Sequence, residues 1–392
     1  MIAKLRALAN RTPLGWLQLR HNRTRFIIAL AGITFADLLM FMQLGVLAAA
    51  LDSSALFHNQ VQADIVLVSP EARDIANSGT IPRARVFQAL EVPGVAEASP
   101  LYVGFLDWRT PLTGERKTMM VVGMDPNRPA LDLPALTTRQ SELKLPDTVL
   151  FDRLARGNFT AMLAVLDQGK PVKAEINRRT VTVTSSFSLG ATFNTDGTLI
   201  GNETTFLHLF PNRDSGSVTF GLVNIAPTTD RQQVVADLKR KFPDDVNVLT
   251  REEFIQNARD FQLRYTPIGF IFGLGTVMGF LVGLVMVYQI LSSDVADHMS
   301  EYATFKAMGY TDFYLLGIII EESLILACLG FIPGLISGFG IMRLIHAGTA
   351  LPVSFPMTRI AGVFLLTLGM CIVSGFIAAR RIRQADPAEI FS

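Results

Sequence analysis

The sequence predicts a membrane α-helical protein with four transmembrane helices and a large periplasmic α+β domain that contains a β-rich inserted subdomain. Composition and the spacing of apolar runs predict this class. Apolar residues make up 49% of the 392 residues and charged residues only 18%, against about 25% charged residues in a typical soluble domain. Four runs reach the roughly 20 apolar residues that a helix needs to cross a bilayer. A mostly polar segment separates the first run from the other three.

We expect the four transmembrane helices at 26–50, 267–291, 314–345 and 360–379. The first run exceeds the roughly 7–15 apolar residues of a signal peptide, so we interpret it as a retained span. The net charge of +1 provides no basic field of the kind that binds nucleic acid. Cys328 and Cys371 both lie in apolar runs, which excludes a disulfide framework or a zinc cluster.

Basic residues beside the spans predict the orientation. The segment 1–25 carries lysine and arginine but no acid, and the tail 380–392 begins with two arginines. Positive flanks remain in the cytoplasm. We therefore expect a multi-pass protein of the inner (plasma) membrane with both termini in the cytoplasm. Four crossings then place 51–266 and 346–359 outside and 292–313 inside.

The segment 1–25 predicts a short helix at the cytoplasmic interface. Thr12 and Pro13 are typical of an N-cap followed by proline at the first helical position. Leucines and Trp16 follow, and a helix lying on the membrane surface would bring them into contact with lipid. One long helix with an ordinary capped start is the alternative.

The segment 51–266 predicts an α+β domain in two parts. Within 51–124, and again within 218–255, a strand, a short helix, a turn with proline and a second strand follow one another. We interpret these blocks as halves of one split subdomain. Between them, 125–217 holds strand-like pieces separated by glycine, asparagine and aspartate turns, which predicts a β-rich inserted subdomain. No catalytic motif or cysteine pair occurs, so we expect no catalytic, cofactor-binding or metal-binding residue.

Two of the spans carry glycine at every fourth position. The stripes are Gly275, Gly279 and Gly283 in the second span and Gly330, Gly334 and Gly338 in the third. Small residues at this spacing let another helix approach closely, so we expect both stripes to be helix-packing faces. Packing alone would explain them, since such faces are common in membrane bundles. The alternative is that they slide against neighbouring helices during a functional cycle.

Four polar residues fall inside the predicted spans: Asp37, Gln43, Glu321 and Glu322. A rise of 1.5 Å per residue from Arg25 puts Asp37 roughly 18 Å deep, near the bilayer midplane. An acid in the membrane is costly and is a functional candidate. The alternative is a hydrogen bond to a serine or threonine of another helix. The second span offers no acid or histidine for a proton relay, which argues against proton coupling.

The segment 292–313 predicts a cytoplasmic coupling helix. It would run from about Asp294 to Met308, with two preceding serines as caps and Gly309 as its end. Asp294, Asp297 and Glu301 would share one face beside an apolar face, so the helix could dock a partner. A solvated connector is the alternative. The candidate coupling residues are Asp294, Asp297, Glu301, Tyr302, Lys306, Met308 and Gly309.

Several motifs resemble those of the MacB/FtsX-type ABC permeases. Ser300-Glu-Tyr-Ala-Thr-Phe-Lys-Ala-Met-Gly309 is similar to their Arg-Glu-Ile-x-x-x-Arg-Ala-Leu-Gly signature, with Ser300 in place of the first arginine. Glu322-Ser323 and the terminus Asp386-Pro-Ala-Glu-Ile-Phe391 resemble further family motifs. More specifically, the segments 12–19, 35–45, 146–153, 267–275 and 288–291 resemble the DevC branch. The resemblance extends over essentially the whole chain.

The resemblance implies the permease subunit of a tripartite ABC exporter. A separate DevA-like ATPase would bind ATP and Mg, since this sequence contains no Gly-x-x-x-x-Gly-Lys-Ser/Thr phosphate loop. A DevB-like periplasmic adaptor (a membrane fusion protein) would connect a homodimer of this chain to a TolC-like outer-membrane channel. ATP-driven motion would pass through the loop around 294–309 to the periplasmic domain and drive export. Glycolipid is one candidate substrate, because relatives export it.

Three other classes stay open. A LolC/LolE-like permease releases lipoproteins, and an FtsX-like protein transmits a signal to cell-wall hydrolases without transport. A membrane enzyme is disfavoured by the lack of a catalytic grouping. An adaptor partner would favour the exporter, and a hydrolase partner would favour the signal transmitter. Membrane lipid is an expected partner in every case, and nucleic acid is not.

Overall fold

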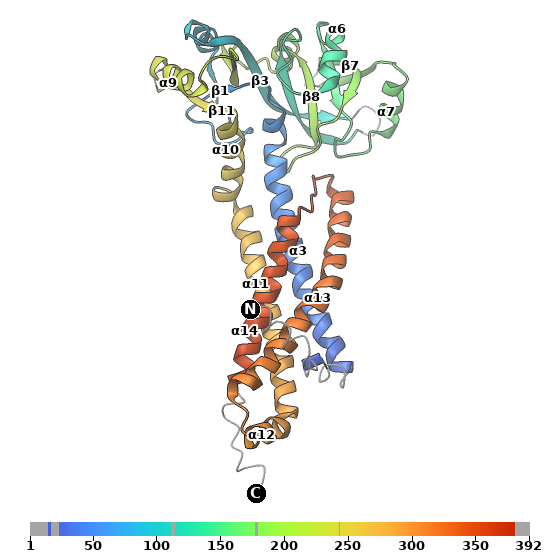
Figure 1. Ribbon diagram of the computed structural model, residues 1–392. Coiled ribbons are helices and arrows are strands. Elements are labelled where there is room, and N and C mark those ends of the chain that lie inside the picture. The colour runs from blue at the N-terminus through green and yellow to red at the C-terminus, as the bar shows by residue number, and fades with distance from the viewer. Residues whose placement is uncertain (1–14, 17–22, 111–113, 177–178, 243, 381–392) are drawn as a thin grey trace. The chain divides into compact units, whose positions relative to one another are not determined.

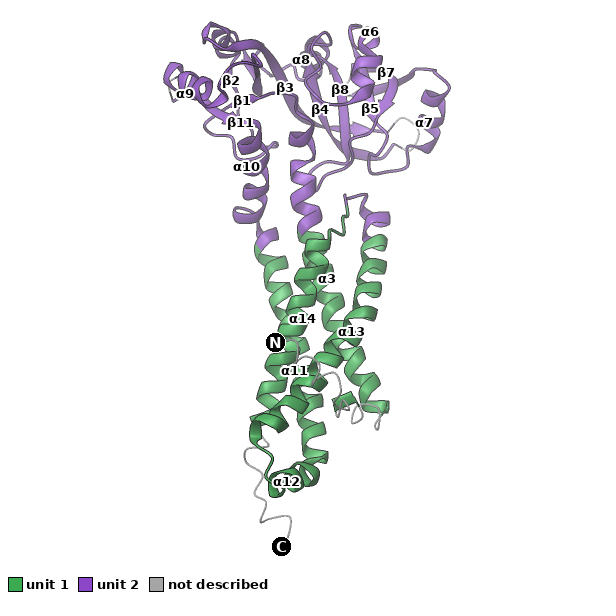
Figure 2. Ribbon diagram, viewed as in Figure 1, with its two compact units in different colours: residues 1–47, 270–344, 353–392 green, residues 48–269, 345–352 purple. Residues whose placement is uncertain are grey.

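The structure is a computed structural model that describes residues 15–16, 23–110, 114–176, 179–242 and 244–380. Two compact units divide the chain (Figure 2). Unit 1 comprises residues 1–47, 270–344 and 353–392, and unit 2 comprises residues 48–269 and 345–352. Most of the predicted interfacial helix at 1–25 lies outside the described residues, as does the predicted tail after Arg380. Of the segment 1–25, Gly15 and Trp16 are helical, and residues 23–25 belong to the long helix that begins at Arg23.

Long helices form unit 1 (Figure 1). They are α3 (Arg23–Gln60), α11 (Pro267–Asp297), α13 (Asp312–Thr349) and α14 (Met357–Ala379), with a shorter α12 (Met299–Ala307) in the inner loop. In the described part of the chain, these four long helices are the ones long and apolar enough to cross a membrane. The four-helix part of the predicted fold class is thereby confirmed.

The helix boundary in the inner loop differs from the prediction. The helix α11 continues through the serines at 292 and 293 to Asp297, and α12 begins at Met299 after a break at His298. A serine caps a helix where the chain enters it from a non-helical conformation. Here the preceding turns are already helical and Leu291 and Val295 are buried, so the predicted caps are interior residues of α11.

Unit 2 is built on a nine-stranded sheet in the order β11-β1-β10-β3-β4-β8-β5-β7-β6 (Figure 1). Its strands are β1 (Ile65–Val68), β3 (Val95–Arg109), β4 (Arg116–Met124), β5 (Thr148–Asp152), β6 (Val172–Ile176), β7 (Arg179–Phe187), β8 (Gly197–Asn202), β10 (Phe220–Ile225) and β11 (Asn247–Thr250). A separate short ladder pairs β2 (Ile81–Pro82) with β9 (Ser217–Val218). The helices are α4 (Arg83–Gln88), η1 (Ala89–Glu91), α5 (Pro134–Thr138), α6 (Gln140–Leu143), α7 (Thr160–Asp167), α8 (Glu203–Leu209), α9 (Arg231–Lys241) and α10 (Arg251–Arg264).

One end of this sheet combines two strand–helix–strand blocks. The strands β1 and β3 flank α4, and β10 and β11 flank α9. The four strands interleave as β11-β1-β10-β3 with antiparallel neighbours, which is the arrangement of a split β-α-β-β-α-β motif. Alternate side chains of β1 enter opposite cores, Leu67 with Val86 and Leu238 and Val66 with Phe254. The unit therefore has apolar cores on both faces of this part of the sheet.

The strands of 125–217 extend the same sheet. The strand β8 pairs in parallel with β4. The sheet then curves round through β5 and β7 until its last strand, β6, pairs with β3 at Trp108 and Ile176. The indole of Trp108 packs inside against the rings of Phe151 and Phe159, with centroids 5.1 and 6.0 Å away. The predicted separate inserted subdomain is not confirmed, because β4 and β8 share hydrogen bonds and one core.

Candidate functional site

The first glycine stripe lies against α3. A Cβ added at Gly275 would come 2.5 Å from the Gln43 side chain, and one at Gly283 would come 2.7 Å from the Cβ of Ala36. Between them, Gly279 faces Met40. Real Cβ atoms essentially never come within 3.0 Å of another residue's heavy atom. At Gly275 and Gly283, α11 therefore packs against its neighbours at a distance that only glycine permits.

The second stripe lies against another face of α3. Added Cβ atoms at Gly330, Gly334 and Gly338 would come 2.6, 2.6 and 2.9 Å from side-chain atoms of Ile33, Asp37 and Phe41 respectively. The helix α3 is therefore held between two glycine faces, one from α11 and one from α13. Sequence reasoning identified the stripes, but it could not show that both meet the same helix.

Asp37 is fully buried inside unit 1. Thr367 of α14 donates a hydrogen bond from Oγ1 to its Oδ1 at 2.6 Å. Its Oδ2 is buried beside Gly334 and has no hydrogen-bond partner among the described residues. The structure thus gives Asp37 the threonine partner that was one of the two sequence-based interpretations. The Oε1 of Gln43 is also buried without a partner among these residues.

The helix α12 packs one face on the beginning of α13 (Figure 1). Tyr302 is fully buried in a cluster with Val295, Leu315 and Ile319. The opposite side of α12 is exposed, and Met308 at its end is 61% exposed. One face of α12 is therefore buried in unit 1, and the opposite face is accessible to a partner.

The turn after α12 is fixed at two points. Gly309 ends the helix with φ +91°, a left-handed conformation that favours glycine. Lys306 Nζ forms an ion pair with Asp312 Oδ1 at 3.2 Å. This ion pair ties the last turn of α12 to the first turn of α13.

The three acids of the inner loop do not form one exposed face. Asp294 is buried, with His298 Nδ1 3.5 Å from its Oδ2. Asp297 is exposed but forms an ion pair with Arg25 at the start of α3. Glu301 is exposed. The predicted shared face is wrong because α11 runs on through 294–297 and turns Asp294 into the bundle.

Glu321 and Glu322 differ in their surroundings. Glu321 is half-buried, whereas Glu322 is 1% exposed and neither of its carboxylate oxygens has a hydrogen-bond partner among the described residues. The backbone of Glu322 contacts Gly15, where an added Cβ would come 3.0 Å from its amide nitrogen. The depth of Glu322 could not be read from its position about two turns into a predicted span.

Unit 2 contains a partly buried polar network that the sequence did not predict. Arg83 donates from Nη1 to the Tyr102 hydroxyl at 2.9 Å and pairs through Nη2 with Glu203 at 2.9 Å. Burial raises the pKa of both Tyr102 and Glu203. Nearby, the Thr219 hydroxyl accepts from the amide of Val103 and donates to its carbonyl. No periodicity in the sequence signals these contacts.

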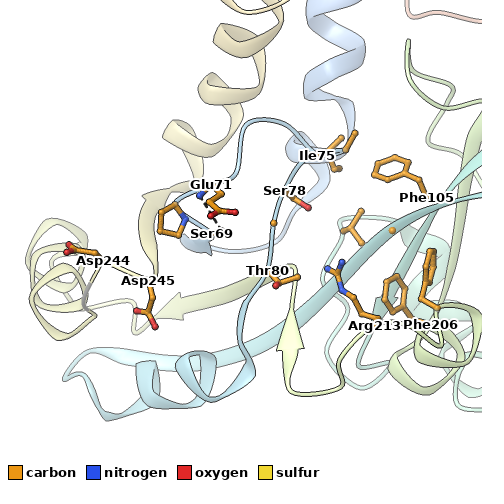
Figure 3. Close-up of a pocket in the computed structure, with 16 residues that line it drawn as sticks. Ser69, Glu71, Ile75, Ser78, Thr80, Phe105, Phe206, Arg213, Asp244 and Asp245 are labelled. Carbon is orange, nitrogen blue, oxygen red and sulfur yellow. Dashed lines mark hydrogen bonds between the residues drawn. The ribbon is translucent and has the colours of Figure 1, made fainter.

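This network lies beside a cavity of about 810 Å³ (Figure 3). The cavity is lined by β3, by the segment from Ser69 to Thr80 between β1 and β2, by α8 and the turn that follows it, and by the turn before β11. Its walls carry hydroxyls, phenyl rings, carboxylates and one guanidinium. Within the described residues, no group of three histidine, cysteine, aspartate or glutamate side chains could hold a metal ion.

Apart from α3, the helices named in unit 1 lie in a range that matches a known permease family. Residues 260–387 match the family model described as "FtsX-like permease C-terminal". This range includes α11, α12, α13 and α14. This part of the chain is therefore similar to the membrane domain of FtsX-like permeases.

A curated relative and two solved structures are similar to parts of the chain. An uncharacterized ABC transporter permease of Methanocaldococcus jannaschii is 26% identical over 210 residues, which cover 48% of this chain and 52% of that protein. The chain thus spans about half the length of the curated relative it matches.

The solved structures are extramembrane domains. The periplasmic region of MacB from Actinobacillus actinomycetemcomitans is 12% identical, with a TM-score of 0.33 over 50% of this chain and 92% of that chain. The extracellular domain of the noncanonic ABC-type transporter YknZ from Gram-positive bacteria is 12% identical, with a TM-score of 0.33 over 48% of this chain and 100% of that chain.

Proposed function

We propose that this chain is the permease subunit of an ABC exporter of the MacB type and the DevC branch, driven by a separate ATPase. The observation that carries the proposal is the FtsX-like permease domain at 260–387. The similarity to an ABC transporter permease supports it. A DevA-like subunit would bind ATP and Mg, and this chain alone would hydrolyse no ATP.

Motion would enter through α12. Its buried face seats it on α13, and its exposed face, with Glu301 and Met308, is free to receive the ATPase. The Arg25–Asp297 ion pair connects the end of α11 to the start of α3. A push on α12 would therefore act on α11, α13 and α3 together.

The motion would leave through the helices that continue into unit 2. The helices α3, α11 and α13 each begin in one unit and end in the other. The end of α13 is anchored within unit 2, because Arg156 donates from Nε to the Thr349 carbonyl at 2.7 Å and pairs with Asp196. The glycine faces hold α3 against α11 and α13, so the three helices would move as one group or slide along these contacts.

The remaining parts of the proposal concern location and partners. The protein would reside in the inner membrane with both termini in the cytoplasm and unit 2 in the periplasm. A homodimer would bind a DevB-like adaptor and, through it, a TolC-like channel, with glycolipid as a candidate substrate. A LolC/LolE-like lipoprotein-releasing permease, or an FtsX-like signal transmitter, would use the same membrane domain with other partners.

Site-specific cross-linking tests the docking of the ATPase. Cysteine placed at Met308, in a Cys328→Ala background, should cross-link to a co-expressed ATPase subunit in membranes. The matched control is cysteine at Tyr265, which is 77% exposed but lies in unit 2. Cross-linking at both sites or at neither site would contradict docking at α12. Purification in mild detergent then distinguishes the classes, because an adaptor indicates the exporter and a hydrolase the signal transmitter.

A further inference from the structure

The cavity in unit 2 has walls of different chemical character. Its volume of about 810 Å³ lies within the roughly 300–1,000 Å³ of small-ligand pockets. Figure 3 shows Arg213 near Phe206 on one side, and Asp244 and Asp245 on the other, with Glu71 between the two groups. A ligand that fits this cavity must therefore satisfy opposite charges at separate places.

Phenyl rings form the apolar part of the lining. The rings of Phe206 and Phe210 stack with their centroids 4.5 Å apart. Phe210 also covers Gly104 of β3, where an added Cβ would come 2.7 Å from the ring. Packing on both sides holds these rings in place before any ligand binds, which reduces the entropy lost on binding. Phe105 adds a third ring to the lining.

Arg213 is a half-buried cation without a carboxylate partner among the described residues. The one hydrogen bond of its guanidinium among these residues runs from Nη2 to Thr219 Oγ1 at 2.9 Å, although a guanidinium has five N–H groups. Burial lowers the pKa of the guanidinium, as expected when no anion compensates for desolvation. A ligand carboxylate would supply the missing charge and can bond a guanidinium through two parallel hydrogen bonds.

Three carboxylates lie on the other side of the cavity, and two of them form no ion pair with a described residue. Asp245 pairs with Arg85 at 3.0 Å. Glu71 and Asp244 line the cavity, are exposed, and are the two without such an ion pair. An ammonium group, which offers three donors and no acceptor, is complementary to such oxygens.

We propose that this cavity binds short apolar peptides as zwitterions. The α-carboxylate lies at Arg213, the α-ammonium lies at Glu71 and Asp244, and the apolar side chains contact the phenyl rings. This site goes beyond the proposed function and requires neither nucleotide nor partner. An anionic amphiphile without an amine would contact Arg213 and the rings but would gain nothing from the carboxylates of Glu71 and Asp244.

Calorimetric titration of the full chain in lipid nanodiscs tests the proposal, with tri-leucine as the probe and empty nanodiscs as the blank. Tri-leucine should bind saturably. Its C-terminal amide should bind about tenfold more weakly or worse, because the guanidinium then stays unpaired. The N-acetylated peptide should also lose affinity. These comparisons use the unaltered protein and do not depend on the folding of a variant.

Variants assign the two ends of the peptide. Arg213→Gln should weaken tri-leucine binding as much as amidation does and should make the acid and amide forms equivalent. Asp244→Asn should weaken the free peptide but not the acetylated one. Arg116→Gln, at an exposed arginine outside the cavity lining, is the matched control and should change nothing.

Four results would overturn the proposal. These are no saturable binding at millimolar peptide, equal affinity for acid and amide, equal affinity for free and acetylated peptide, and unchanged binding in Arg213→Gln. The third result would indicate an anionic amphiphile instead, because the amine would then contribute nothing.

Discussion

At the scale of single residues, unit 2 depends on a threonine that replaces backbone pairing. The strand β3 pairs with β10 only up to Leu101, and at Val103 the Thr219 hydroxyl occupies the position of a partner strand. It donates once and accepts twice, from Val103 and from Arg213. Its full hydrogen-bonding capacity is used, so its loss leaves three polar groups without this partner.

We predict that Thr219→Val destabilises the protein although the two side chains have nearly the same shape. Each buried polar group left unsatisfied costs about 1–3 kcal/mol, so the loss should be at least about 2 kcal/mol in total. Denaturant unfolding followed by the fluorescence of the buried Trp108 would measure it. Thr184→Val is the control, because Thr184 Oγ1 is already buried without a partner among the described residues. A loss in the control as large as in Thr219→Val would contradict the assignment.

A second residue-scale prediction concerns the glycine faces. Alanine is a better helix former than glycine by about 1 kcal/mol, so Gly340→Ala, with open space around it, should be neutral or stabilising. Gly334→Ala on the same helix should destabilise the bundle, because its Cβ would come 2.6 Å from the Cβ of Asp37. Overpacking of this kind costs about 1–3 kcal/mol. Thermal unfolding in detergent compares the two variants, and equal stabilities would show that α3 and α13 are not in close contact.

At the scale of elements, α12 owes its position to packing. It has nine residues, fewer than the roughly 12–15 that an isolated helix needs in water. Burial of Tyr302 against Leu315 and Ile319 provides the missing stabilisation. Because α12 is held by its buried face, side chains on its exposed face can be substituted without unfolding the protein. Mutations on that face can therefore separate binding from folding.

Charge reversal on α12 uses this separation. Glu301→Lys keeps a good helix former at an exposed position, so the stability change should stay within about 0.5 kcal/mol. Binding of the ATPase should weaken about tenfold or more if Glu301 meets a basic surface. Asp297→Lys is less clean, because it also removes the ion pair with Arg25. Pull-down of the ATPase measures the effect, with Glu175→Lys on β6 as the charge control. If Glu301→Lys bound the ATPase as well as the unaltered protein, Glu301 would not be part of the docking surface.

At the scale of the whole molecule, local patterns predicted the membrane helices because the bilayer imposes a length on each apolar run. The sequence placed Asp37 inside an apolar helix, but it could not identify its partner Thr367, which is 330 residues away in the chain. The pairing of β4 with β8 could not be predicted either, because the sequence of a strand does not specify which strand lies beside it. The cavity could not be predicted either, because four separate segments of unit 2 contribute to it. Long-range contacts therefore account for what the sequence did not predict.

The length of α3 leads to a prediction about the whole chain. Its 38 residues extend roughly 57 Å at 1.5 Å per residue, about twice the thickness of the roughly 30 Å bilayer core. The helix must therefore continue beyond the membrane, and the basic residues before it favour a cytoplasmic start.

In a Cys328→Ala background, cysteine at the exposed Asn194 should react with an impermeant maleimide in intact spheroplasts. Cysteine at the exposed Glu301 should react only after permeabilisation, because α12 would lie on the other side. The reverse pattern would show that the protein has the opposite orientation, and α12 could then not receive a cytoplasmic ATPase.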